Sequence, residues 1–143
     1  MRLTLAALLL ATPAAAWEFR ADPVCTLTHD GPEARVVITR DPALAEPYTI
    51  AVTRSQPWPA TPGFAIRYEG ARPFAIGTDR HRRSPDGRSL SVSDTGFGNL
   101  LDGLELGGRA VAIAGDAQAA FDLTGAAGPV QAFRACSSGV PVG

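Results

Sequence analysis

Lysine is absent from this sequence of 143 residues, so all 13 of its basic side chains are arginines. The absence excludes the phosphate-binding loop G-x-x-x-x-G-K-[ST], because its lysine must reach the β- and γ-phosphates of a nucleotide. An excision helicase also needs two motor domains, which a chain of this length cannot hold. The sequence therefore predicts neither an excision helicase nor any related ATPase.

Histidine and cysteine are scarce, with two of each. His29 and His81 are 52 positions apart, and no G-x-S-x-G motif supplies a hydrolase nucleophile. Zinc sites need three or four Cys, His or carboxylate ligands, and the segment 94–99 lacks the acidic spacing of a calcium loop. We therefore predict no enzyme, no catalytic residues, no metal site and no cofactor.

A long hydrophobic run is also absent. The apolar segment 3–11 is too short to span a bilayer, where about 20 residues are required. Arg2 precedes this segment and three alanines, 14–16, follow it, a pattern typical of a signal peptide. We predict a signal peptide at 1–16, cleavage before Trp17 and no lipid anchor. The mature chain, 17–143, is then a single β-rich domain in the periplasm or outside the cell.

The predicted mature chain has little net charge. Removing Arg2 with the signal peptide leaves 13 − 1 = 12 basic and 14 acidic side chains, a formal charge of 12 − 14 = −2. This balance provides no bulk attraction to nucleic acid or to an anionic membrane. We expect no nucleic-acid partner, no membrane span and a monomeric protein.

The two cysteines, Cys25 and Cys136, lie near the ends of the mature chain. Two cysteines in an exported protein predict one disulfide, whereas a metal site or redox pair needs close spacing such as C-x-x-C. In the loop-entropy model, closing a loop of about 100 residues stabilises a domain by roughly 4–5 kcal/mol. We therefore predict a structural Cys25–Cys136 disulfide.

Apolar and polar residues alternate with period two through most of the mature chain. The runs are short, rich in β-branched and aromatic residues, and bounded by proline, glycine or aspartate. The apolar positions of these runs are Cys25, Leu27, Val36, Ile38, Tyr48, Ile50, Val52, Phe64, Ile66, Tyr68, Phe74, Ile76, Leu90 and Val92. Such runs predict a mainly β fold: an antiparallel β-sandwich or barrel with two short helices, closed by one disulfide.

The first helix is expected within 96–108. Asn99 is its predicted N-cap, and Asp102 lies in the first turn, where a carboxylate favours the positive helix end. The apolar face consists of Leu100, Leu101 and Leu104, and Gly107 or Gly108 ends the helix.

The second helix is expected at 128–136. Pro129 suits its first position, and Val130, Phe133 and Cys136 fall on one side. Between the helices, 109–123 predicts a hairpin that turns at Gly115-Asp116.

The segment 55–63, SQPWPATPG, has three prolines around Trp58. Prolines remove ladder donors, so this segment is a loop or an edge. A stiff loop that presents an aromatic residue loses little entropy on binding, which makes Trp58 a candidate binding residue. The alternative, which we favour, is a lid in which Trp58 covers one end of the core.

The segment 78–92, TDRHRRSPDGRSLSV, concentrates arginines around a Pro-Asp-Gly corner. A three-residue loop, 85–87, would set Ser84 opposite Arg88. In that register Arg80 and Arg82 share a face with Phe74, Ile76, Leu90 and Val92, while Asp79, His81 and Arg83 occupy the other face. The basic run is thus divided between two faces. We expect Arg80 and Arg82 either to lay their stems along the apolar edge with their charged heads outward, or to pair with carboxylates such as Asp94.

The C-terminal part of the chain resembles the end of the invasion-associated locus B family. The resemblance lies in LLDGLELGGRAVAI and FDLTGAAGPVQAFRAC, and Trp17 and Cys25 are similar to that family's aromatic start and first cysteine. The chain departs from the family at 107–109, Gly-Gly-Arg, where a lysine-rich turn is usual. The resemblance implies an exported β-sandwich with two short helices.

The whole chain more closely resembles small uncharacterised exported proteins of alphaproteobacteria. These share a segment like DRHRRS followed by DTGFGNLLDGL. Such chains have sometimes been named as the helicase component of an excinuclease, a role that the missing lysine contradicts. Neither resemblance carries catalytic residues that transfer to this chain.

Two functions are compatible with these patterns. The first, which we predict, is a non-catalytic exported binding or envelope-accessory protein whose partner is an envelope protein or ligand of unknown identity. The alternative is a small enzyme or enzyme inhibitor that recognises an anionic ligand through Arg80, His81 and Arg82.

Overall fold

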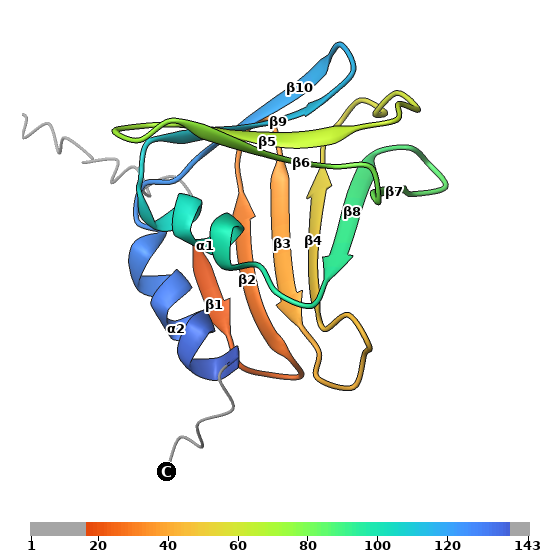
Figure 1. The fold of residues 1–143 in the computed structure, drawn as a ribbon. Coiled ribbons are helices and arrows are strands. Elements are labelled where there is room, and N and C mark those ends of the chain that lie inside the picture. The colour runs from red at the N-terminus through yellow and green to blue at the C-terminus, as the bar shows by residue number, and fades with distance from the viewer. Residues whose placement is uncertain (1–16, 138–143) are drawn as a thin grey trace, which may run out of the picture.

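The computed structural model describes residues 17–137, which form ten strands and two helices (Figure 1). The predicted signal peptide, 1–16, lies outside the described residues. All strand pairs are antiparallel, and the strands form two separate sheets. The predicted mainly β fold is confirmed.

The larger sheet has six strands in the order β1-β2-β3-β4-β8-β7. Their bounds are β1 Glu18–Arg20, β2 Cys25–Asp30, β3 Arg35–Arg40, β4 Tyr48–Thr53, β8 Ser89–Asp94 and β7 Arg82–Arg83. The smaller sheet has the order β10-β9-β5-β6. Its bounds are β10 Ala117–Asp122, β9 Arg109–Ala114, β5 Phe64–Glu69 and β6 Phe74–Thr78.

The smaller sheet lies across the larger one, with its strands running across those of its partner (Figure 1). The two sheets do not close into a barrel, so the architecture is a sandwich. One buried hydrophobic cluster lies between them and continues beneath both helices. Alternate residues of the central strands supply it, as the period-two pattern predicts.

Helix α1 (Gly98–Glu105) begins two residues earlier than the sequence suggests. Phe97, whose side chain is 8% exposed, takes the N-cap position, and its carbonyl oxygen accepts the Leu101 N–H at 2.9 Å. Asn99 is therefore inside the helix and is not the cap, because packing of Phe97 into the core fixes the start. Asp102 is not in the first turn but pairs with Arg134 at 2.6 Å.

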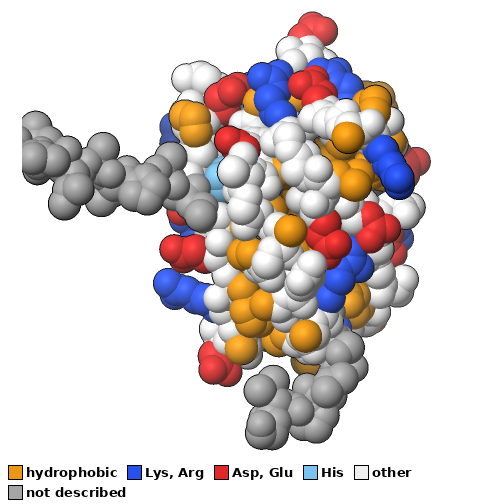
Figure 2. All heavy atoms as spheres, turned by 90° about the vertical axis from the view of Figure 1, so that its left-hand side faces the viewer, with side chains coloured by type: hydrophobic (Ala, Val, Ile, Leu, Met, Phe, Trp, Pro, Cys, Tyr) orange, Lys and Arg blue, Asp and Glu red, His pale blue; other side chains and the backbone are white. Residues whose placement is uncertain are grey.

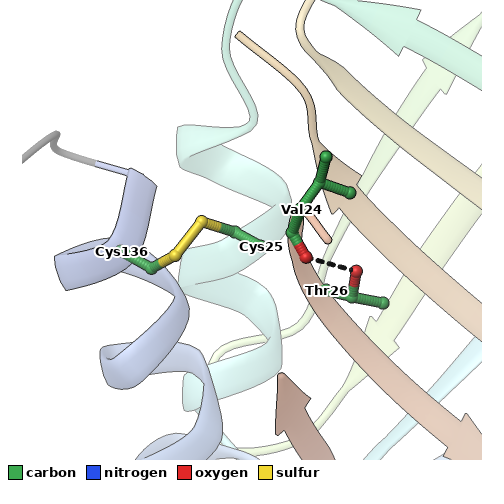
Figure 3. Close-up of a disulfide and its surroundings, with 4 residues drawn as sticks. All are labelled: Val24, Cys25, Thr26 and Cys136. Carbon is green, nitrogen blue, oxygen red and sulfur yellow. Dashed lines mark hydrogen bonds between the residues drawn. A yellow bond between two sulfur atoms is a disulfide. The ribbon is translucent and has the colours of Figure 1, made fainter. Parts of the chain in front are cut away.

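Helix α2 (Ala127–Ser137) packs over β1 and β2 (Figure 1). The sequence placed Pro129 first in this helix, but it is the third residue, still within the first turn, where its missing N–H costs no helical bond. Val130 and Phe133 are fully buried, as predicted. Near its end, Cys136 is bonded to Cys25 at the start of β2, with the two Cα atoms 6.2 Å apart (Figure 3). The predicted disulfide is confirmed.

The β9–β10 hairpin turns at Gly115-Asp116, as predicted, with Ala114 paired to Ala117. The β7–β8 hairpin differs from the prediction by one residue, because Arg82 pairs with Ser91 and Arg83 with Leu90.

The side chain of Asp86 explains this shift in register. Its carboxylate accepts hydrogen bonds from the Ser84 hydroxyl at 2.6 Å and the Arg88 N–H at 3.0 Å, so Arg88 joins a four-residue loop. The Ser84 N–H then donates to the Ser89 carbonyl oxygen at 2.9 Å.

The chain changes sheets between β6 and β7. Phe74 and Ile76 therefore lie in a different sheet from Arg82, and the predicted common face does not form. Period-two alternation orders residues within one continuous strand, and here the strand is interrupted at 79–81.

Candidate functional site

A cleft of about 660 Å³ lies between the two sheets on the side of β6 and β8. Its apolar lining consists of Ile50, Phe64, Ile66, Ile76, Val92, Phe97 and Leu100. Ile76 and Val92 are only partly buried, whereas most of the others belong to the core. The cleft is therefore a place where the core reaches the surface.

The strand arrangement explains why the cleft is open. β6 is an edge strand of the smaller sheet. β7 pairs with only two residues of β8, so residues 92–94 have a strand neighbour on the β4 side alone. Within residues 17–137 no strand bridges the two sheets here, and the start of α1 forms the remaining wall.

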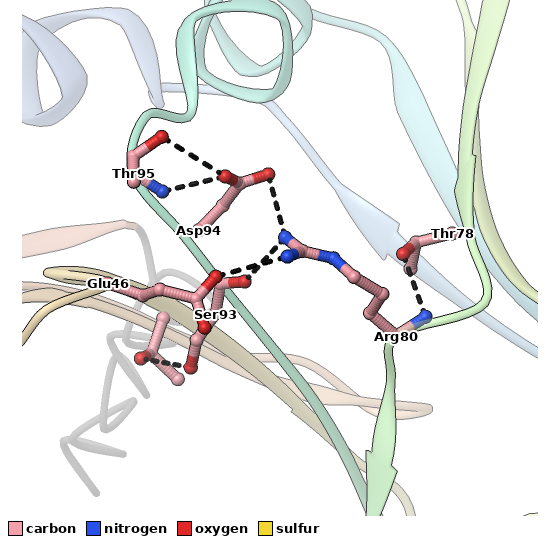
Figure 4. A network of polar contacts seen from close by, with 7 residues as sticks. Glu46, Thr78, Arg80, Ser93, Asp94 and Thr95 are labelled. Atoms are coloured by element: carbon pink, nitrogen blue, oxygen red, sulfur yellow. Dashed lines mark hydrogen bonds and ion pairs between the residues drawn. The ribbon is translucent and has the colours of Figure 1, made fainter.

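Arg80 provides the polar rim of the cleft (Figure 4). Its guanidinium group pairs with Glu46 at 3.3 Å and with Asp94 at 3.4 Å, and it donates to the Ser93 carbonyl oxygen at 3.3 Å. Glu46 comes from the β3–β4 loop and Asp94 from the end of β8. Of the two arrangements that the sequence allowed, Arg80 thus takes the one that pairs it with Asp94, and it joins three segments of the chain.

The charge at this rim does not favour an anion. One guanidinium faces two carboxylates, so the group carries a formal charge of −1. Asp94 also accepts the N–H and hydroxyl of Thr95, at 2.7 and 3.3 Å. The rim thus offers both hydrogen-bond donors and acceptors, with a small excess of negative charge.

The amino end of α1 adds donors to the same cleft. The first bond within the helix is Leu101 N–H to Phe97 O, so the N–H groups of residues 98–100 have no acceptor inside the helix. All three residues line the cleft. A hydrogen-bond acceptor held here would satisfy groups that the helix leaves unpaired.

The sequence prediction placed Arg80, His81 and Arg82 in one candidate binding group, but the structure does not gather them. Arg80 lies at the cleft with its two carboxylates. The His81 ring lies 6.1 Å from the ring of Phe64. Arg82 is exposed and pairs with Ser91, whose side chain faces away from the core. The three side chains therefore have separate environments.

Trp58 is fully buried, with 0% of its surface exposed. Its indole N–H donates to the Val52 carbonyl oxygen at 3.2 Å, and its ring meets Phe64 edge-on at 6.2 Å. The Arg54 guanidinium covers the other side at 4.6 Å from the ring centroid. This arrangement is that of a core lid and not of an exposed binding aromatic.

The sequence prediction did not identify the cleft. Ile76 and Val92 were recognised as apolar positions of the alternating runs, but alternation does not reveal that they face an opening. The two-residue length of β7 is the cause, and that length depends on where the chain crosses between sheets. The glycine-rich stretch 96–98, which leads into α1, was the one local signal, since it brings backbone close to the cleft.

Comparison with protein-family models, with curated proteins and with solved structures gave no match.

Among residues 17–137, no helix is long and apolar enough to cross a membrane. Within the same residues, no group of three or more His, Cys, Asp or Glu side chains could hold a metal ion. The face on the left of Figure 1 carries both charge signs among small hydrophobic patches (Figure 2). Function must therefore be inferred from the geometry of the chain itself.

Proposed function

We propose that the protein is a non-catalytic exported binding protein that holds a small amphipathic ligand in the cleft between β6 and β8. The observation that carries this proposal is the cleft of about 660 Å³, with an apolar floor and a few polar groups at one rim. Ligand pockets commonly have volumes of about 300–1,000 Å³ and this distribution of apolar and polar groups.

The rim indicates the kind of head group. Glu46 and Asp94 accept hydrogen bonds, while Arg80 and the first N–H groups of α1 donate them. A neutral or zwitterionic head that both donates and accepts satisfies these groups better than a simple anion. The apolar body of the ligand would lie against Ile76 and Val92.

Export is supported by two independent features. Residues 1–16 have the pattern of a signal peptide, and the Cys25–Cys136 disulfide is typical of proteins in oxidising compartments.

The alternative function, an enzyme or inhibitor using Arg80, His81 and Arg82 on an anion, lacks support because these side chains diverge and Arg80 is already neutralised.

The test fills the cleft without changing the sheet. In Val92→Trp the added rings occupy the space against the smaller sheet, whereas Val37→Trp adds the same bulk on the outer face of the larger sheet. Wild-type mature protein is titrated calorimetrically with an alkyl glycoside and an alkyl betaine of medium chain length. We expect binding by wild type and Val37→Trp, and at least about tenfold weaker binding by Val92→Trp.

Circular dichroism of all three proteins verifies that they are folded. Absence of binding by wild type to either amphiphile, or equal binding by Val92→Trp and Val37→Trp, would contradict the proposal.

A further inference from the structure

A second depression, of about 580 Å³, lies where the proline-rich loop, β7 and the β9–β10 turn meet. Arg54 and Arg83 line it together with the loop residues around Trp58, and Asp116 and Gln118 line it from the turn. It shares no lining residue with the cleft between β6 and β8. It is therefore a separate feature of the surface.

Arg54 is held in a fixed position at this depression. Its guanidinium lies over the Trp58 ring, and Nη2 donates to the Pro57 carbonyl oxygen at 2.6 Å. Nη1 reaches the Gln118 carbonyl oxygen at 3.5 Å, a longer contact. The side chain is thus ordered by a ring and by backbone oxygens, and its charge is not neutralised by these contacts.

Arg83, in β7, is also held by a hydrogen bond to the proline-rich loop. Its Nε donates to the Trp58 carbonyl oxygen at 2.7 Å. The guanidinium also passes close to Gly87, where an added Cβ would lie 2.7 Å from Nη2. Because Nε makes the backbone bond, the two terminal nitrogens keep their donors for another acceptor.

Neither arginine has a carboxylate partner within residues 17–137, although Arg35, Arg67, Arg80, Arg109 and Arg134 all do. The nearby Asp86 is occupied by Ser84 and Arg88, whose hydrogen bonds hold its pKa below the ordinary value. Of the carboxylates in the described part of the chain, only Asp116 lines the depression. Two guanidinium groups facing one carboxylate leave the site positively charged.

We propose that Arg54 and Arg83 form a binding site for a tetrahedral oxyanion, a phosphate or sulfate group. Guanidinium groups bind such oxygens through paired, charge-assisted hydrogen bonds. Side chains that are already ordered lose little entropy when the anion binds. The depression is shallow and open, which suits a terminal ester group on a larger molecule as well as the free ion.

Nuclear magnetic resonance of the arginine Nε–H groups and of the Trp58 indole N–H tests this site. The folded protein is titrated with inorganic phosphate, inorganic sulfate and a sugar phosphate, with chloride at the same ionic strength as reference. We expect phosphate and sulfate, but not chloride, to shift the Arg54 and Arg83 signals in a saturable way. Tighter binding of the sugar phosphate would identify an ester as the better ligand, and equal binding would identify the free ion.

Three variants separate the site from general electrostatics. Arg83→Gln should weaken phosphate binding roughly ten- to hundredfold, as expected for loss of a charge-assisted hydrogen bond. Arg82→Gln removes the same charge one residue away, on the outer face, and should change binding less than about threefold. Asp116→Asn should tighten binding, because it removes the carboxylate that competes for the guanidinium groups.

Two results would overturn the proposal: no anion-specific shift at Arg54 and Arg83, or equal weakening by Arg83→Gln and Arg82→Gln. Neither result bears on amphiphile binding in the cleft, since the two sites share no residue.

Discussion

At the scale of single residues, His29 is an ionisable side chain buried in the core. It is 5% exposed, on the inner face of β2, and its ring stacks on Trp17 with centroids 4.9 Å apart. Its Nδ1 is buried and has no hydrogen-bond partner among the residues that the structure describes. Burial lowers the pKa of His29 below 6.5, although the negative charges of Asp122 and Asp30 act in the opposite direction.

This lowered pKa predicts that the protein loses stability in mild acid. Well above pH 6.5 the imidazole is neutral in both the folded and the unfolded protein, so its titration takes nothing from the free energy of unfolding. As the pH falls below 6.5, the unfolded chain binds the proton first, so stability decreases until the folded-state pKa is reached. Urea unfolding of wild type should show a falling midpoint across this range.

The matched variant is His29→Phe, which keeps an aromatic ring against Trp17 and removes the titration. Its unfolding midpoint should vary less with pH between about 7.5 and 5.5, a range above the ordinary pKa of carboxylates. An equally steep pH dependence in His29→Phe would show that another group is responsible.

At the scale of elements, α1 approaches β5 unusually closely. A Cβ placed on Gly103 would fall onto the ring of Tyr68. The Tyr68 hydroxyl donates to the Leu100 carbonyl oxygen at 2.9 Å, and burial raises its pKa, so the hydroxyl stays protonated at neutral pH. Glycine at this position allows the helix to rest on the sheet.

We predict that Gly103→Ala destabilises the protein by about 1–3 kcal/mol, because the added methyl group overpacks this contact. Gly98→Ala is the matched control in the same helix, since a Cβ there meets nothing within 4 Å. Alanine is the better helix former, so this variant should be neutral or more stable by up to about 1 kcal/mol. Denaturant unfolding measures both, and similar effects would contradict the close-packing interpretation.

The strands and their registers also show what could and could not be predicted from the sequence. Strand positions followed from alternation, because that pattern depends on each strand alone. The assignment of β6 and β7 to different sheets did not follow, since it depends on tertiary packing. The shifted β7–β8 register arose from the Asp86 side chain. The cleft and the Arg54–Arg83 pair result from these tertiary features, so neither was predicted.

At the scale of the whole molecule, the two ends of the described chain are fastened to each other. The Cys25–Cys136 bond spans 111 positions. The Trp17 indole N–H donates to the Asp122 carbonyl oxygen at 2.9 Å, which links the first strand region to β10. The last helix and the first strands therefore depend on each other.

We predict that the double variant Cys25→Ala/Cys136→Ala loses about 2–5 kcal/mol of unfolding free energy, since its unfolded chain is no longer constrained. Guanidinium unfolding of this variant, with disulfide-bonded wild type as the reference, measures the loss. Peptide mapping of unreduced mature protein should contain a cross-linked Cys25–Cys136 peptide. Two free thiols in that map would be inconsistent with the disulfide.

The position of α2 affects the order in which the core of the protein can be buried as the chain emerges. Val130 and Phe133 are fully buried and belong to the same core as Leu27 and Trp17, more than a hundred positions earlier. A chain that emerges from a ribosome or a translocation channel starting with β1 must therefore wait for its final helix. Until then β1 and β2 remain uncovered by α2, so vectorial synthesis delays burial of this part of the core to the last step.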